Sequence, residues 1–106
     1  MANSFVTNLY PKPTANTTME RLQVTAATSE TGNAFSTTYQ GVTKYIVLDV
    51  QDADVLVNYN GDPTSDLGHR LYAGRSYTWS KQAAQSAKFI KAGTTAANIH
   101  ATEFTD

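Results

Sequence analysis

The sequence of 106 residues contains no cysteine, few charged side chains and no long hydrophobic run. Because cysteine is absent, a disulfide framework, a thiolate metal site and a cysteine nucleophile are all excluded. Charged residues make up 16% of the chain, whereas about 25% is usual in globular domains. The 8 basic and 9 acidic side chains give a formal net charge of −1. We therefore expect no nucleic-acid partner, since proteins that bind a phosphate backbone carry a basic excess.

Signals for membrane insertion and secretion are missing as well. No apolar stretch approaches the roughly 20 residues that cross a bilayer. The segment Met1–Val6 lacks the basic and long apolar regions of a secretory signal, and Ala2 stands where N-myristoylation requires glycine. The sequon Asn16-Thr17-Thr18 has a meaning only inside a secretory pathway. We expect a soluble protein that is made in a cytoplasm and has no membrane partner.

Neutral polar residues take the place of the missing charge, with 16 Thr, 7 Ser and 7 Asn in the chain. Hydrophobic residues reach 41%, which is low for a globular domain but too high for a disordered chain. The length allows one hydrophobic core and no second one. From composition alone we expect a single threonine-rich β domain.

Residues 1–18 differ from the rest and predict an extended N-terminal arm. Two prolines among Asn, Thr and Ser favour extended backbone and oppose a helix, and large apolar residues are more frequent than in a solvated tail. The arm can pack on its own domain as an edge strand, dock on a partner subunit, or be disordered. Its candidate partner-binding residues are Phe5, Val6, Leu9, Tyr10, Pro11 and Pro13.

From residue 19 to residue 106 the alternation of apolar and polar residues predicts one domain of about seven to eight short strands. Its clearest strand is Tyr45–Val50, in which Ile46, Leu48 and Val50 share one face. Lys81–Ala87, with Ser80 as its cap, is the one plausible helix, although a single turn fits equally well. The other strands are expected near residues 22–26, 35–39, 54–59, 69–73, 76–80, 89–90 and 97–104. The fold class is all-β, an antiparallel β-sandwich or jelly-roll-like domain, with a small barrel as the alternative.

The sequence gives only weak signals of a catalytic or metal-binding motif. A calcium loop would begin at Asn58, but Pro63 and His69 occupy the positions that require glycine and glutamate. His69 and His100 lie too far apart in sequence for a zinc motif, and neither a nucleophile elbow nor a phosphate-binding loop is present. We expect no enzymatic activity, no metal and no cofactor. The acidic residues that are candidates for a calcium site are Asp49, Asp52, Asp54, Asp62 and Asp66.

Four aromatic residues allow a second hypothesis, in which an exposed face of the domain stacks on sugars or bases. A domain of this size has few large side chains and needs them for its core. We therefore favour the core or a subunit interface as the place of Trp79. The four residues are Tyr59, Tyr72, Tyr77 and Trp79.

The order of strand and turn segments between Tyr45 and Phe104 resembles small β-sandwich virion proteins of tailed bacteriophages. These proteins show a strand, a turn of the Asn-Gly-Asp-Pro-Thr type, a Gly-His-x-Leu-x-Ala-Gly turn, an Ala-Lys-Phe-Ile strand and a closing strand. The segments that carry the resemblance are YIVLDV (45–50), DVLVNYNGDPT (54–64), GHRLYAG (68–74), YTWS (77–80), AKFI (87–90) and IHATEF (99–104).

The resemblance implies a structural, non-enzymatic role in the virus particle, after synthesis in the cytoplasm of a host bacterium. The nearest comparison is with capsid decoration or cementing proteins, which bind and bridge major capsid subunits at the capsid surface, often as dimers or trimers. An arm of 18 residues spans up to roughly 60 Å when extended, enough to reach a neighbouring major capsid protein or another virion protein. The alternatives are a head–tail or tail accessory protein and a carbohydrate- or receptor-binding module. The resemblance assigns no individual binding residue.

Overall fold

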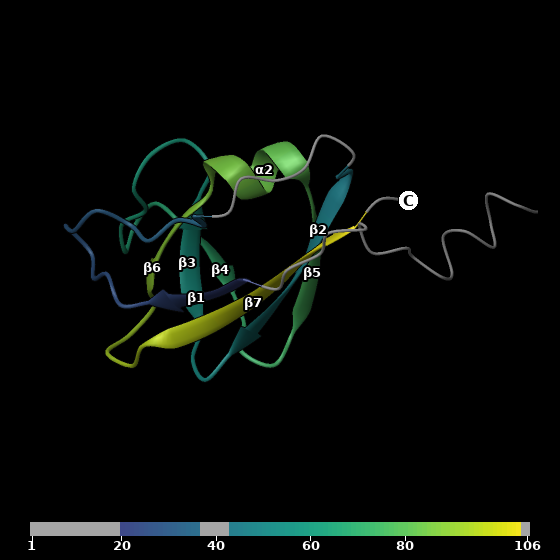
Figure 1. The fold of residues 1–106 in the computed structure, drawn as a ribbon. Helices are drawn as coiled ribbons and strands as arrows, with labels where there is room; N and C mark the ends of the chain where they lie inside the picture. The colour runs from purple at the N-terminus through teal and green to yellow at the C-terminus, as the bar shows by residue number, and fades with distance from the viewer. Residues whose placement is uncertain (1–19, 37–42, 105–106) are drawn as a thin grey trace, which may run out of the picture.

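The computed structural model describes residues 20–36 and 43–104 (Figure 1). The described part of the chain forms strands and one short helix. In chain order these are β1 (Glu20–Val24), β2 (Tyr45–Gln51), β3 (Val55–Asn58), β4 (His69–Leu71), β5 (Ser76–Ser80), α2 (Lys81–Ser86), β6 (Lys88–Lys91) and β7 (Ala97–Phe104).

The strands form two antiparallel sheets, one of four strands in the order β1-β7-β2-β5 and one of three in the order β4-β3-β6. The chain crosses between the sheets after β2, after β4, after β5 by way of α2, and again after β6. The expected all-β class is confirmed in this form, and two facing antiparallel sheets are compatible with a sandwich.

Period-2 alternation places the core between the two sheets. Ile46, Leu48 and Val50 of β2 are fully buried, as their spacing predicted. They face Val57 and Phe89 of the smaller sheet within one hydrophobic cluster. Burying one such side chain stabilises the fold by about 1.5–3 kcal/mol, so this cluster supplies the main driving force for folding.

The inner row of β7 ends in a charged residue. Ala97, Ile99 and Ala101 are buried as their alternation indicates, and the same alternation carries Glu103 to the core face, where it is 4% exposed. The hydroxyl of Thr43, also 4% exposed, donates a hydrogen bond of 2.7 Å to Glu103 Oε1. A buried carboxyl group requires such a partner, because desolvation of a polar group is costly.

The helix α2 covers one end of the core, opposite the turns that join β2 to β3, β4 to β5 and β6 to β7 (Figure 1). Ser80 caps it by accepting a hydrogen bond of 3.2 Å from the Ala83 amide, and Ala84 is buried beneath it. The predicted helix is thus confirmed, one residue shorter than expected.

Backbone hydrogen bonds join the sheets on the side of β1 and β6. The Lys91 amide donates to the Ala26 carbonyl, and Asn33 and Phe89 exchange two hydrogen bonds, all at 2.8 Å. Asn33 Oδ1 also accepts bonds from the Thr25 and Ala26 amides at 2.9 Å. This side chain fixes the chain after β1 against the edge of β6.

The strand expected at residues 35–39 is wrong for the two of its residues that the structure describes. Phe35 and Ser36 belong to no strand, and the pairing with β6 is made earlier, at Asn33. Phe35 instead places its ring edge-on against Phe89, with centroids 5.5 Å apart. Phe35 therefore contributes to the core from a loop. A β-prone composition alone does not distinguish such a loop residue from a strand residue.

Candidate binding surface

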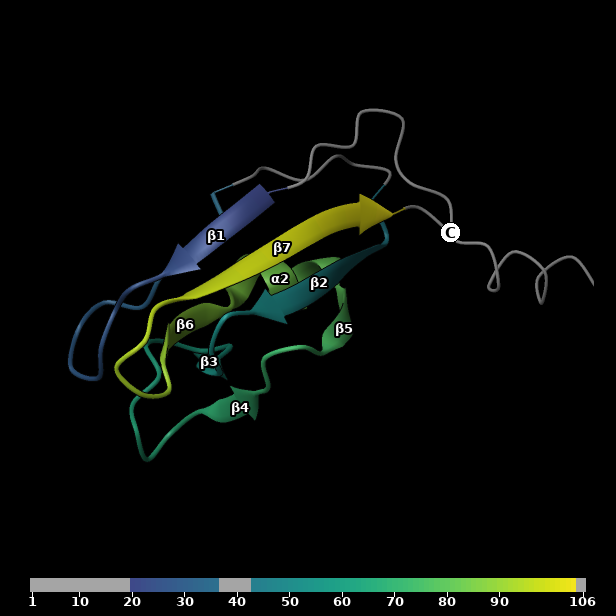
Figure 2. The same ribbon diagram turned by 90° about the horizontal axis from the view of Figure 1, so that it is seen from below.

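Aromatic side chains close the sandwich on the side of β4 and β5, where the two sheets share no backbone pairing. Figure 2 shows these two edge strands on the side of the molecule opposite β1. The Trp79 ring contacts Tyr59 edge-to-face at 5.3 Å and stacks on Phe89 at 5.9 Å, and Tyr59 lies 6.1 Å from the His69 ring. We call Tyr59, His69, Tyr77 and Trp79 the aromatic seam.

The seam is partly core and partly surface. Tyr77 and Trp79 point inward from β5 and pack on the hydrophobic cluster, which is where the sequence favoured placing Trp79. Both remain half-buried, whereas Tyr59 is exposed at the rim. Partial burial raises the pKa of Tyr59 above its ordinary value by penalising the phenolate. The seam thus presents aromatic surface that its own domain covers only in part.

A basic cluster adjoins the seam at the turn between β4 and β5. Tyr72 is 49% exposed, and its amide donates a 2.9 Å hydrogen bond to the Tyr77 hydroxyl. The guanidinium carbons of Arg70 and Arg75 lie 5.8 and 5.6 Å from the Tyr72 ring centre, within cation–π range. We call Asp54, Arg70, Tyr72 and Arg75 the Tyr72 cluster.

One arginine of the Tyr72 cluster is neutralised and the other is not. Asp54 Oδ2 accepts from Arg70 Nε at 3.0 Å and lies 2.9 Å from Nη2, while Asp54 Oδ1 accepts from the Ala73 amide at 2.7 Å. The Ala73 amide first, and Arg70 second, hold the pKa of Asp54 below its ordinary value. Within residues 20–36 and 43–104, no carboxylate forms an ion pair with Arg75. Arg75 could therefore form an ion pair with an acidic group on a partner.

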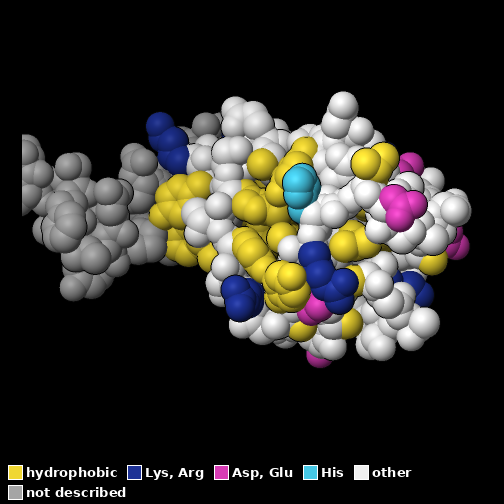
Figure 3. Space-filling model, turned by 180° about the vertical axis from the view of Figure 1, so that it is seen from behind, with side chains coloured by type: hydrophobic (Ala, Val, Ile, Leu, Met, Phe, Trp, Pro, Cys, Tyr) yellow, Lys and Arg dark blue, Asp and Glu magenta, His cyan; other side chains and the backbone are white. Residues whose placement is uncertain are grey.

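Figure 3 shows the molecule from behind relative to Figure 1. On this face hydrophobic side chains gather around a histidine, and basic side chains lie beside them. Exposed aromatic and arginine side chains are the residue types that dominate binding energy at protein interfaces. The combined surface of the seam and the Tyr72 cluster is therefore our candidate binding surface.

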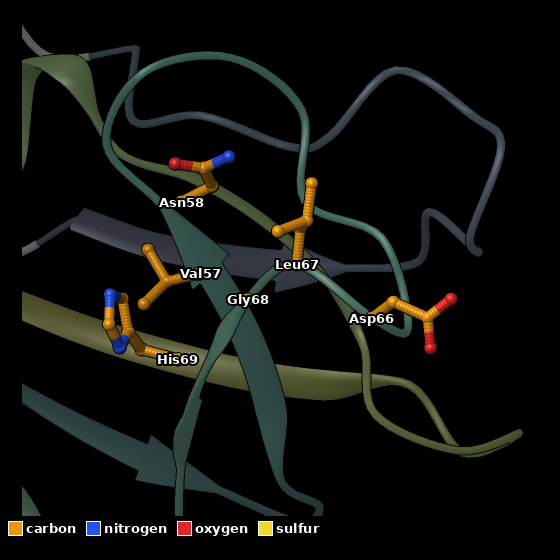
Figure 4. Close-up of a pocket in the computed structure, with 6 residues that line it drawn as sticks. All are labelled: Val57, Asn58, Asp66, Leu67, Gly68 and His69. Carbon is orange, nitrogen blue, oxygen red and sulfur yellow. The ribbon is translucent and has the colours of Figure 1, made fainter.

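A shallow hollow of about 310 Å³ opens beside the seam, where the loop after β3 returns to β4 (Figure 4). Leu67 is 68% exposed at its mouth. In Figure 4 the carboxylate of Asp66 points away from the His69 ring, so the two do not form an acid–base pair. The residues that line the hollow are Val57, Asn58, Asp66, Leu67, Gly68 and His69.

The loop that frames the hollow is held from its far side. Asp62 accepts a 2.9 Å hydrogen bond from the Gly32 amide and lies 3.5 Å from Lys88 Nζ, and these contacts lower its pKa, the Gly32 amide most. Pro63 is fully buried. Gly61 has φ +116°, a conformation that favours glycine in the predicted Asn-Gly turn.

The acidic residues considered from the sequence do not converge on one point. Asp49 accepts from the Ser76 hydroxyl, and Asp52 accepts from the side-chain Nδ2 of Asn98 at 2.6 Å. Among the described residues no group of three or more His, Asp or Glu side chains could hold a metal ion. Neither does any described helix have the length and apolarity needed to cross a membrane. His100 lies on β7, in the other sheet from His69 of β4.

The structure leaves the predicted arm contacts untested and adds residues that the sequence did not single out. All six candidate contacts lie outside the described residues: Phe5, Val6, Leu9, Tyr10, Pro11 and Pro13. Arg70 and Arg75 were missed, because their approach to the Tyr72 ring depends on the geometry of the turn at Gly74 and has no signal in the residue types alone. A comparison of the sequence with protein-family models and with curated proteins finds no match to either.

Proposed function

We propose that the protein is a structural component of a bacteriophage particle, a capsid decoration or cementing protein that binds and bridges major capsid subunits and stabilises the head. The observation that carries a binding role is the candidate binding surface, in which the exposed Tyr72 ring lies beside an arginine with no acidic partner among the described residues. The resemblance of residues 45–104 to small virion proteins is the reason for placing this binding role in a virus particle.

The contact chemistry suits a lattice of identical partners. Tyr72 and Arg75 would meet an acidic and apolar patch of the major capsid protein or another virion protein, and many weak contacts per particle add up through multivalency. The proposal includes a jelly-roll-like connectivity, an extended arm at residues 1–18 that reaches a neighbouring subunit, and a location at the capsid surface. It invokes no catalysis and no cofactor.

The proposal is tested by co-sedimentation of the purified protein with empty capsids of the phage that encodes it. We expect saturable binding at hundreds of copies per particle. The double substitution Tyr72→Ala and Arg75→Ala should weaken binding about tenfold or more, the range of an interface hot spot. Gln85→Ala, an exposed change on α2 away from this surface, is the matched control and should bind as the unchanged protein does.

Two other results would replace the proposal. Binding limited to one ring of copies per particle would indicate a head–tail or tail accessory protein. Absence of capsid binding, together with binding to a glycan array that Tyr72→Ala abolishes, would establish the carbohydrate-binding alternative, which the exposure of Tyr72 favours.

The arm is tested separately by limited proteolysis with mass spectrometry of the isolated protein. Rapid cleavage within residues 1–18, with the domain from about Leu22 intact, supports an arm that docks on a partner. Protection of the same residues in a monomer would make the arm part of the fold and would remove it from the proposal.

A further inference from the structure

The strand β5 is an edge strand without the features that normally prevent edge pairing. Charged residues, proline, bulges or a covering segment protect most natural edges. Of the other edge strands in the described chain, β1 carries Glu20 and Arg21, β4 is three residues long and contains Arg70, and β6 is covered by the Ala26 and Asn33 backbone. The five residues of β5 include no charge and no proline.

The free edge of β5 presents the backbone of Thr78. Val50 donates its amide to the Arg75 carbonyl at 3.1 Å and accepts from the Gly74 amide at 2.8 Å, so the backbone of Val50 points towards β5. Since hydrogen-bonded and non-hydrogen-bonded pairs alternate along antiparallel strands, Tyr77 and Trp79 bond to β2, and the N–H and C=O of Thr78 point away from it. No described strand pairs with that side of β5.

The sequence of β5 is complementary to itself when the strand is reversed. Ser-Tyr-Thr-Trp-Ser reads outward from Thr78 as an aromatic residue and then a serine in both directions. Two antiparallel copies centred on Thr78 therefore bring serine opposite serine, Tyr77 opposite Trp79, and Thr78 opposite itself. Aromatic pairs and threonine pairs directly across two strands are among the stabilising combinations.

We propose that two copies of the chain pair through β5 in a symmetric dimer, with Thr78 opposite Thr78 of the partner subunit. The two Thr78 residues exchange two backbone hydrogen bonds, and the two four-stranded sheets become one continuous sheet. The half-buried Tyr77 and Trp79 pack against the partner's Trp79 and the partner's Tyr77, which covers the part of the aromatic seam that β5 contributes. The five paired residues carry no charge; just beyond each end the register continues to Arg75 and the partner's Lys81, where the chain has left β5 for the preceding turn and for α2. The pairing stands independently of the virion proposal.

The first test is the mass of the full-length protein in solution, measured by light scattering after size exclusion. We expect a dimer of twice the 11.5 kDa of the chain. Thr78→Lys places two like charges directly opposite each other and should shift the protein to a monomer, with at least a tenfold weaker dimer. Thr102→Lys, in the same row of the sheet but two strands from the edge, adds the same charge and should leave the dimer intact.

A second variant separates loss of pairing from loss of folding. Because the Thr78 amide points away from β2 and pairs with no described strand, Thr78→Pro is compatible with an edge strand. It removes the donor that the dimer needs. We expect a folded monomer, with the far-ultraviolet circular dichroism spectrum of the unchanged protein.

A cross-link tests the register itself. Opposed residues of a hydrogen-bonded antiparallel pair have Cα atoms about 5.5 Å apart, within the range that a disulfide spans. The chain has no cysteine, so Thr78→Cys introduces a single thiol and should form a disulfide-linked dimer on mild oxidation. Thr102→Cys should not. A monomeric or trimeric unchanged protein, or a dimer that survives both Thr78→Lys and Thr78→Pro, would overturn the proposal and place any contact elsewhere, including the arm.

Discussion

At the scale of single residues, Phe89 holds three parts of the core together. Its ring contacts Phe35 from the loop after β1 and stacks on Trp79 of β5, and its backbone bonds to Asn33. We expect Phe89→Ala to lower the free energy of unfolding by about 3–5 kcal/mol, the usual cost of removing a buried aromatic ring. Urea denaturation followed by Trp79 fluorescence measures this loss. Leu67→Ala, at an exposed position, should change it by less than about 0.5 kcal/mol.

Asp54 provides a test of the Tyr72 cluster through its pKa. The pKa of Asp54 in the folded protein lies below its ordinary value of 3.8, so the carboxylate contributes stability above that value, and the contribution is lost as pH falls through the folded pKa. Carbon-detected NMR titration of the Asp54 carboxyl should give a midpoint below 3.8. In Arg70→Gln the midpoint should rise only part of the way, because the Ala73 amide is the larger cause. A complete return to 3.8 would contradict this order of causes.

At the scale of elements, the cap of α2 makes a measurable contribution. The Ser80 side chain accepts the Ala83 amide at the start of a helix of 6 residues, and removal of such a cap costs about 0.5–2 kcal/mol. We expect Ser80→Ala to lower the midpoint of urea unfolding accordingly. Ser86→Ala is the matched control, because the Ser86 hydroxyl bonds only to carbonyls of the same helix. Equal losses in the two variants would contradict a capping role.

Elements with a strong alternation were predictable from the sequence, and those that depend on distant partners were not. The buried faces of β2 and β7 follow from Ile46, Leu48, Val50 and Ile99 alone. The order of strands within each sheet does not, because antiparallel alternation leaves the choice of neighbour open. The pairing of Asn33 with β6 depends on an amide side chain that caps two backbone donors, and Glu103 is buried against a hydroxyl from a distant segment. Neither contact has a local signature.

The candidate binding surface was predictable only in its aromatic half. Tyr59, Tyr72, Tyr77 and Trp79 stand out because large side chains are scarce in this chain. The basic half arises from the turn after β4, which brings Arg75 back to the ring that Arg70 already contacts. Such a juxtaposition follows from turn geometry rather than from residue type.

At the scale of the whole molecule, the two long sides of the sandwich differ in what closes them. The β1–β6 side is joined by backbone bonds at Ala26 and Asn33, and the β4–β5 side by side-chain contacts, namely the aromatic rings and the hydrogen bond from the Tyr72 amide to the Tyr77 hydroxyl. We expect native-state hydrogen exchange to be slow at the Phe89 and Lys91 amides and fast at the Thr78 amide of the monomer. Uniform protection of both sides would contradict the difference. In Thr102→Lys, which keeps the dimer, the Thr78 amide should become protected, whereas in Thr78→Lys the amide of residue 78 should exchange rapidly.

The neighbouring positions of β1 and β7 have a mechanical consequence. Glu20 pairs with Ala101 in an antiparallel register, so the chain enters β1 and leaves β7 at the same end of the sheet. Tension applied between those two points loads the hydrogen bonds between the strands one after another, as a zip opens, rather than all at once. The domain should therefore yield at low force when pulled from its two ends. It should resist far more strongly when pulled along the axis of β2, whose neighbours on both sides must slide together.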